Sequence, residues 1–238
     1  MLLFYVRHGD PVYDPDSLTP LGRRQAEALS KRLAVYGLDA VYASTSRRAI
    51  DTARPTCELL KKDLTTMDWC NENHCWNTLT HVTEDGLRGW LWEFPDVVEQ
   101  LNDPAVRALD RRWYEHPYFR DCSYGPAIQR VQREADAWLA SLGYEHDLNK
   151  NMYLCREENK RRIALFAHQG FGLAFLSCVL DVPYPQFCTH FDMGHSGMSV
   201  IRFPEGPGWC APTMLQLSND SHIYHEGLPT TYQNYIRI

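Results

Sequence analysis

Two short apolar runs, residues 2–6 and 163–167, each end directly at a polar block that contains a histidine, and this pair constrains the fold most. A short continuous apolar run bounded by a turn signal is typical of a strand buried in a parallel sheet. The first run continues into Arg7-His8-Gly9 and the second into His168-Gln169-Gly170. Because open α/β sheets bind ligands beyond the carboxyl ends of their strands, we expect both histidines at one ligand crevice.

Helix signals lie between these runs. Thr19-Pro20 is typical of a helix start, with threonine as the cap and proline at the first helical position. Gly37 is a typical stop for that helix. Ser46 is expected to cap the next helix, and Pro55 is expected to break or restart it.

The remaining apolar patterns predict further strands and helices. The strands are expected at residues 38–43, 64–70, 199–203 and 213–217, and the helices at 128–142 and 171–180. Strands that alternate with helices in this way favour an α/β fold. We therefore predict a three-layer α/β/α sandwich with a mostly parallel central sheet.

The stretch from residue 71 to 125 is rich in aromatic residues and only weakly periodic. It holds Trp76, Trp90, Trp92 and Trp113. Because it is too short to hold a core of its own, we interpret it as a cap insertion in a single domain that covers residues 1–238. The tryptophans are most simply core or lid residues, and a stacking wall for an aromatic leaving group is the lesser alternative.

Composition excludes several classes of function. The net charge of −6 lacks the basic excess of a nucleic-acid-binding protein, whereas a local cluster of arginines still permits a small anionic substrate. No apolar run approaches the length of a membrane span, and no signal peptide is recognised. The eight cysteines are expected to be reduced thiols of a cytoplasmic protein. The oligomeric state is left open.

Arginines accompany both histidines. Arg7 precedes His8, and Arg48 is expected in the first turn of a helix that follows a strand, on the same side of the sheet. The guanidinium fork suits phosphate oxygens, and a helix N-terminus adds amide donors. A neutral imidazole flanked by cations is suited to attack phosphorus and form a phosphohistidine. The set predicts a pocket for a phosphoryl group.

Metal binding is not indicated by the other histidines. His190 and His195 are five residues apart, which is not a metal-ligand spacing on a helix, and no zinc-ligand series occurs among the cysteines. We therefore expect neither a metal nor a cofactor.

Four motifs together resemble the histidine phosphatase superfamily, which includes the phosphoglycerate mutase-like proteins. They are Arg7-His8-Gly9, Leu18-Thr19-Pro20-Leu21-Gly22 with Gln25-Ala26, Ser44-Thr45-Ser46-Arg47-Arg48-Ala49 with Thr52-Ala53, and His168-Gln169-Gly170. They occur in the order and spacing of that family. The resemblance implies that His8 is the phosphorylated nucleophile and that His168 is its catalytic partner. It also implies that Arg7, Arg48 and His168 bind the phosphoryl group, and we predict Gln169 as a further phosphate-binding residue.

Two departures from the family bear on function. Asp14 stands where the family often has a phosphate-contacting asparagine, and Asp10 adds a second carboxylate that would repel phosphate unless it is turned away. The mutase motif is absent, which favours a metal-independent phosphatase acting on small phosphate monoesters. A phosphoglycerate mutase-type phosphotransferase and a catalytically weak phospholigand-binding protein remain as alternatives.

A carboxylic acid is needed to protonate the leaving oxygen, and we predict Glu72. It follows the strand expected at 64–70, on the same side as His8, and its neighbours Trp69 and Trp76 would raise its pKa. Glu84 is the rival candidate and Glu93 a weaker third choice.

Overall fold

The centre of the protein is a six-stranded sheet in the order β13-β11-β1-β10-β4-β5. A computed structural model describes residues 1–232, 236 and 237. The strands are β1 (Leu2–Arg7), β4 (Ala40–Ser44), β5 (Leu64–Met67), β10 (Arg162–Ala167), β11 (Met198–Arg202) and β13 (Thr213–Asn219). β1, β10, β4 and β5 are mutually parallel, whereas β11 runs antiparallel to both β1 and β13. The sheet is thus mostly parallel, as predicted.

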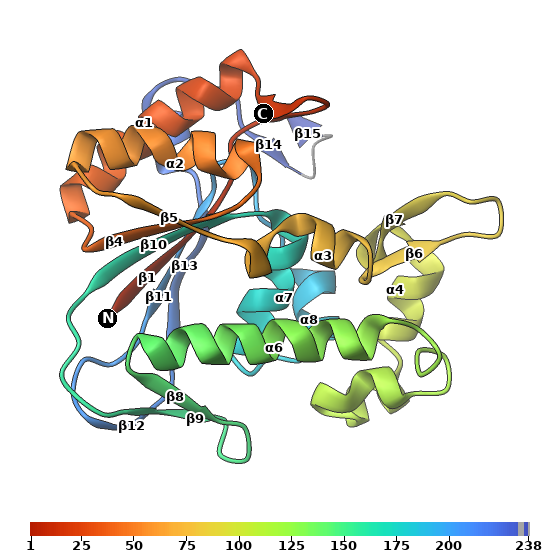
Figure 1. Ribbon diagram of the computed structural model, residues 1–238. Coiled ribbons are helices and arrows are strands. Elements are labelled where there is room, and N and C mark those ends of the chain that lie inside the picture. The colour runs from red at the N-terminus through yellow and green to blue at the C-terminus, as the bar shows by residue number, and fades with distance from the viewer. Residues whose placement is uncertain (233–235, 238) are drawn as a thin grey trace.

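Helices cover both faces of this sheet and confirm the three-layer sandwich (Figure 1). One face carries α1 (Pro20–Tyr36) and α2 (Arg47–Leu60), and the other carries α6 (Tyr124–Ser141), α7 (Gln169–Val179) and α8 (Tyr184–His190). Side chains of β1 alternate between the two cores: Phe4 and Val6 join the first, and Leu3 and Tyr5 join the second. A strand that is apolar at every position is what burial on both faces requires.

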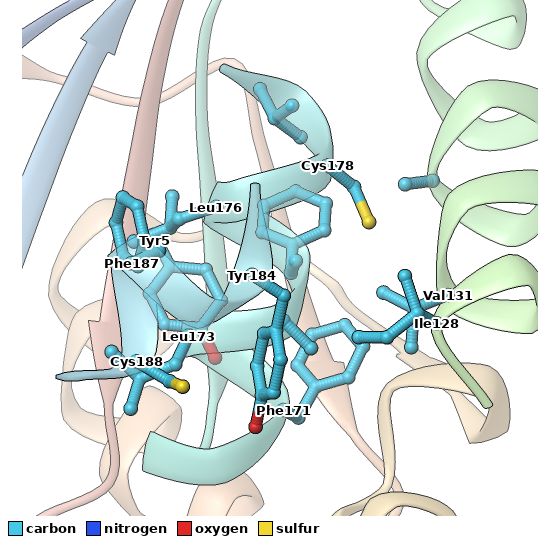
Figure 2. Close-up of a cluster of buried hydrophobic side chains, with 14 of the residues drawn as sticks. Tyr5, Ile128, Val131, Phe171, Leu173, Leu176, Cys178, Tyr184, Phe187 and Cys188 are labelled. Carbon is cyan, nitrogen blue, oxygen red and sulfur yellow. The ribbon is translucent and has the colours of Figure 1, made fainter. Parts of the chain in front are cut away.

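The core beneath α6 and α7 is rich in aromatic residues. Figure 2 shows Tyr5 of β1 beside side chains from α6, α7 and α8. The rings of Tyr5 and Phe175 stack at 5.5 Å between centroids, and those of Phe171 and Phe175 at 5.6 Å. This packing holds α7, and therefore the residues at its N-terminus, firmly against the sheet.

The predicted ends of α1 are confirmed. The Thr19 side chain accepts a hydrogen bond from the main-chain N–H of Gly22, and Gly37 ends the helix with φ of 69°, a value that favours glycine.

Two predictions about α2 are wrong. Pro55 lies inside an unbroken helix, because Ala49, Ala53 and neighbouring buried side chains pack this helix against the protein. That packing outweighs the roughly 3 kcal/mol that an interior proline costs. Ser46 precedes the helix but does not cap it. Instead the N–H of Arg47 donates to the Asp16 carboxylate at 2.7 Å.

Strand boundaries differ from the predictions at two places. β4 begins at Ala40, two residues later than expected, and β5 ends at Met67 because a 3₁₀ helix, η1 (Asp68–Cys70), follows it. A small sheet of β8 (Tyr144–Asp147), β9 (Met152–Cys155) and β12 (Gly208–Cys210) was not predicted, nor was α8.

The segment from residue 71 to 125, here called the cap segment, projects beside the carboxyl ends of the strands (Figure 1). Its elements are α3 (Glu72–Trp76), β6 (Thr80–Val82), β7 (Arg88–Trp90), η2 (Leu91–Glu93), α4 (Pro95–Leu101), α5 (Pro104–Ala108) and η3 (Asp110–Glu115). Its buried apolar side chains, Trp113 and Phe94 among them, belong to the same core cluster as α6 and α7. The division into one domain with this insertion stays a prediction.

Three small elements complete the description. β2 (Pro11–Tyr13) and β3 (Asp16–Leu18) form a hairpin, α9 (Ser221–His225) contacts α1, and β14 (Thr231–Tyr232) pairs with β15 (Ile236–Arg237). All eight cysteines are free thiols. Within residues 1–232, 236 and 237, no helix has the length and apolar character that crossing a membrane requires.

Candidate active site

The predicted site residues meet at the carboxyl ends of four neighbouring parallel strands. Arg7 ends β1, His168 follows β10, Arg48 opens α2 after β4, and Glu72 opens α3 after β5. Arg7, Arg48 and Glu72 border a cavity of about 480 Å³. Its lining consists of Arg7, His8, Tyr13, Arg48, Glu72, Asn73, Trp76, Trp90, Glu93, Gln169 and Gly170. His168 lies directly behind this lining, with its ring centroid 5.3 Å from that of His8.

His8 is buried and oriented by its own neighbour. Its Nδ1 lies 2.8 Å from the main-chain oxygen of Gly9, so Nδ1–H donates there and the lone pair of the neutral ring resides on Nε2. Burial, with smaller contributions from His168 and the arginines, holds the pKa of His8 well below its usual range. A Cβ on Gly9 would lie 2.7 Å from the Gly22 oxygen, so only glycine permits this close approach of β1 to α1. The result is a neutral nitrogen nucleophile in a fixed orientation.

The Arg7 guanidinium contacts His195, which was not predicted as a site residue. Its Nη2 lies 2.9 Å from Nε2 of His195, and the Nδ1 of His195 lies 3.5 Å from the Asp10 carboxylate. Burial lowers the pKa of His195 to about 2, so its neutral ring accepts a hydrogen bond from the guanidinium. His195 precedes the antiparallel strand β11, whose start lies at the carboxyl end of β1. The position of His195 just before an antiparallel strand is the sequence signal that could have identified it as a site residue.

Arg48 forms an ion pair that was also not foreseen. Its Nη1 lies 2.9 Å from the Asp16 carboxylate, which also accepts the N–H of Arg47 at the start of α2. Asp16 belongs to the β2–β3 hairpin and thus fixes Arg48 at the edge of the cavity.

The two carboxylates that raised concern from the sequence do not face the cavity. Asp14 is exposed and does not line it. Asp10 accepts a hydrogen bond from the hydroxyl of Thr19 at 2.6 Å and faces His195. Neither position therefore opposes a phosphate in the cavity.

His168 is fully buried and hydrogen-bonded on one side. The hydroxyl oxygens of Ser44 and Ser46 lie 2.8 and 3.2 Å from its Nε2. The Ser44 oxygen also accepts the N–H of Ser46. On its other side the Nδ1 of His168 lies 3.3 Å from a Glu72 oxygen. Burial and the two arginines hold the pKa of His168 well below its usual range.

Glu72 belongs to the cap segment and lines the cavity together with Arg7, His8 and Arg48. Its Oε1 accepts the N–H of Phe171 at 3.0 Å, in the first turn of α7, and its side chain retains only 13% exposure. Burial raises the pKa of Glu72 to about 7, although Arg48 and Arg7 oppose the shift. A Cβ on Gly170 would lie 2.7 Å from that same oxygen and 2.2 Å from the indole of Trp90, so glycine is required there.

The rival carboxylates occupy different places. Glu84 is exposed in the turn between β6 and β7 and does not line the cavity. Glu93 does line it, and one of its oxygens accepts the N–H of Trp90 at 2.8 Å. Gln169 also lines the cavity, and its amide nitrogen donates to Asp192.

A metal ion has one possible donor set among the described residues. His8, His168 and Glu72 each offer an atom within 4.8 Å of the others, and two imidazoles with a carboxylate form a set that zinc accepts. However, the arginines impose a positive potential there, and they lower the pKa of both histidines. That potential favours an anion over a cation.

Comparison with known proteins identifies the family of the chain. The model of the histidine phosphatase superfamily, branch 1, matches residues 3–211. Among curated proteins no significant match in sequence is found.

Several solved structures share the fold. A phosphoserine phosphatase variant of Entamoeba histolytica with bound phosphoserine is 16% identical, with a TM-score of 0.58 and coverage of 93% of this chain and 98% of that chain. A mycobacterial glucosyl-3-phosphoglycerate phosphatase is 19% identical, with a TM-score of 0.56 and coverage of 91% and 98%. A putative alpha-ribazole-5'-P phosphatase of Escherichia coli is 18% identical, with a TM-score of 0.58 and coverage of 92% and 98%.

The family model covers nearly the whole chain, and the buried histidines and arginines stand at the strand ends where the motifs placed them. The protein therefore belongs to the histidine phosphatase superfamily, branch 1.

Proposed function

We propose that the protein hydrolyses small phosphate monoesters through a phosphohistidine on His8, without a metal ion. One observation carries the proposal: a neutral, oriented imidazole, two arginines and a carboxyl group with a pKa of about 7 share one cavity. The similar structures are of phosphatases or a putative phosphatase, which supports the same class of reaction.

In the first step Nε2 of His8 attacks phosphorus in line, and the bond from phosphorus to the ester oxygen breaks. Charge on the transferring group is spread over its equatorial oxygens, where Arg7, Arg48 and His168 stabilise it. Glu72 in its protonated form gives its proton to the departing alkoxide.

In the second step water attacks the phosphohistidine. The Glu72 carboxylate takes a proton from that water, the bond between phosphorus and Nε2 breaks, and His8 returns to its neutral state with release of phosphate. A pKa of about 7 suits both duties, because the acid and its conjugate base are then both populated near neutral pH.

Rapid quenching with p-nitrophenyl phosphate labelled on phosphorus tests the nucleophile. The wild type should yield an acid-labile, base-stable adduct that His8→Ala does not form, and His225→Ala, at an exposed histidine, serves as the matched control. A normal adduct in His8→Ala would overturn the mechanism. An adduct that persists and transfers its phosphoryl group to 3-phosphoglycerate would favour the phosphotransferase. Phosphate binding with neither an adduct nor turnover would favour a binding protein.

Leaving-group dependence tests the acid. With an alkyl phosphate, Glu72→Gln should lose about two to four orders of magnitude in rate. With p-nitrophenyl phosphate the phosphorylation step should suffer much less, because that phenolate departs without a proton. Glu84→Gln is the control, and the same dependence in that variant instead would move the role to Glu84.

A further inference from the structure

Aromatic side chains form part of the lining of the cavity that holds His8. The indoles of Trp90 and Trp92 stack with centroids 5.1 Å apart and planes 5° from parallel, and Trp76 meets Trp90 edge-on at 5.1 Å. Trp76 and Trp90 line the cavity directly, and Tyr13 of the β2–β3 hairpin lines it as well.

This aromatic wall is fixed in place. The edge of the Trp90 indole lies so close to Gly170 that no Cβ fits between them, and Trp92 stacks on that same indole. Flat, rigid apolar walls favour a flat ring between them, because stacking adds to the gain from burial. A cavity of about 480 Å³ lies within the range of small-molecule sites and holds more than a phosphate group.

The charged lining consists of two arginines and two carboxyl groups, Glu72 and Glu93. Arg7 and Arg48 are the lysine or arginine residues that line the cavity within the described part of the chain, and the proposed function assigns both to the phosphoryl group. Arg88 donates hydrogen bonds to the main-chain oxygen of Trp76 and to the Thr80 hydroxyl, and it does not line the cavity. Glu93 also lines the cavity and accepts the N–H of Trp90. With both arginines engaged by the phosphoryl group, a carboxylate on the leaving group would meet the like charge of Glu93 and no further cation among the described lining residues.

We propose that the site selects phosphate monoesters whose alcohol part is an uncharged or cationic planar ring, and that it discriminates against esters with a carboxylate on the leaving group. This inference rests on the proposed function. Trp76 provides the face for the ring, and Glu93 provides the discrimination against carboxylates.

Four esters with primary alkoxide leaving groups separate these effects from the chemistry of the reaction. They are 2-phenylethyl phosphate, 2-cyclohexylethyl phosphate, n-butyl phosphate and the phosphate ester of 4-hydroxybutyrate. We expect kcat/KM for the phenyl ester to exceed that for the cyclohexyl ester about three- to tenfold, since the two differ mainly in planarity. The hydroxybutyrate ester should fall about tenfold below the butyl ester.

Variants assign the preferences to residues. Trp76→Ala should abolish the difference between phenyl and cyclohexyl esters, and Trp76→Phe should restore most of it. Glu93→Gln should narrow the gap between the butyl and hydroxybutyrate esters and leave the ring preference intact. Trp209→Ala, at a half-exposed tryptophan on β12, is the matched control. Inhibition by inorganic phosphate should not change in Trp209→Ala, because Trp209 does not line the cavity.

Binding of the matching phosphonates, measured by calorimetry, separates this inference from the proposed function. Equal turnover of all four esters, or a preference for the carboxylate ester, would overturn the inference and leave the phosphatase function standing. A ring preference in phosphonate binding without hydrolysis of any ester would support the inference and overturn the proposed reaction. If no ester is hydrolysed, equal binding of the phenyl and cyclohexyl phosphonates would overturn the inference of a ring-selective site.

Discussion

Glu72→Gln should stabilise the protein at alkaline pH and much less at acid pH. Burial raises the pKa of Glu72 from 4.5 to about 7, so the folded protein retains a proton that the unfolded chain releases. The stability associated with that proton is fully present below pH 4.5 and is lost as the pH rises through 7. Glutamine keeps an oxygen for the N–H of Phe171 but carries no charge that burial would penalise.

The pKa of Glu72 in the unfolded chain, 4.5, and in the folded protein, about 7, together set the size of this pH-dependent difference in stability. Between pH 5 and pH 8 the wild type should lose about 2–3 kcal/mol of unfolding free energy relative to Glu72→Gln. The titrations of His8 and His168 occur in both proteins and cancel to first order in this difference. For a chain of this length, the rise in Tm caused by Glu72→Gln should be about 5–10 °C larger at pH 8 than at pH 5.

Urea unfolding followed by tryptophan fluorescence at the two pH values measures this difference. Glu84→Gln is the matched control, because it is exposed and should change the unfolding free energy by less than about 0.5 kcal/mol at either pH. An equal effect of Glu72→Gln at pH 5 and pH 8 would refute the reasoning. It would mean that the carboxyl group ionises alike in the folded and unfolded states.

Three further predictions concern the phosphoryl end. Arg48→Lys keeps the charge but loses the guanidinium fork, so turnover should fall about one to three orders of magnitude, whereas Arg47→Lys, at an exposed position, should be near wild type. Phosphatase activity should survive EDTA, and a loss that Mg²⁺ or Zn²⁺ restores would instead indicate a metal at His8, Glu72 and His168. Gly170→Ala should lower the unfolding free energy by about 1–3 kcal/mol, because its Cβ would clash with Trp90, whereas Gly206→Ala, with open space around it, should not.

The sequence predicted the parts of the site that follow buried parallel strands. The apolar runs before Arg7 and His168 are local signals, and the two strands lie side by side with the predicted polarity. Arg48 and Glu72 were placed by the same rule, since each follows a strand of the same parallel set.

The contacts that hold those groups were not predictable in the same way. His195 reaches Arg7 from the start of an antiparallel strand, and Asp16 reaches Arg48 from a short hairpin. Neither has a periodic or capping signature. Pro55 and Ser46 were misjudged because local preference was overridden, in one case by packing and in the other by the use of the serine hydroxyl at His168. Tertiary contacts decided all four positions.

The placement of Glu72 has a consequence for how such a protein diversifies. The groups at the phosphoryl end come from β1, β10 and the first turn of α2, whereas Glu72, Trp76 and Trp90 come from one contiguous stretch after β5. Insertions or exchanges within that stretch, beyond Glu72 and away from the contact of Trp90 with Gly170, alter what the leaving group touches and leave the groups from β1, β10 and α2 in place. On the proposed mechanism, substrate preference can therefore drift by changes in one continuous segment of the gene, while selection on the chemistry acts elsewhere.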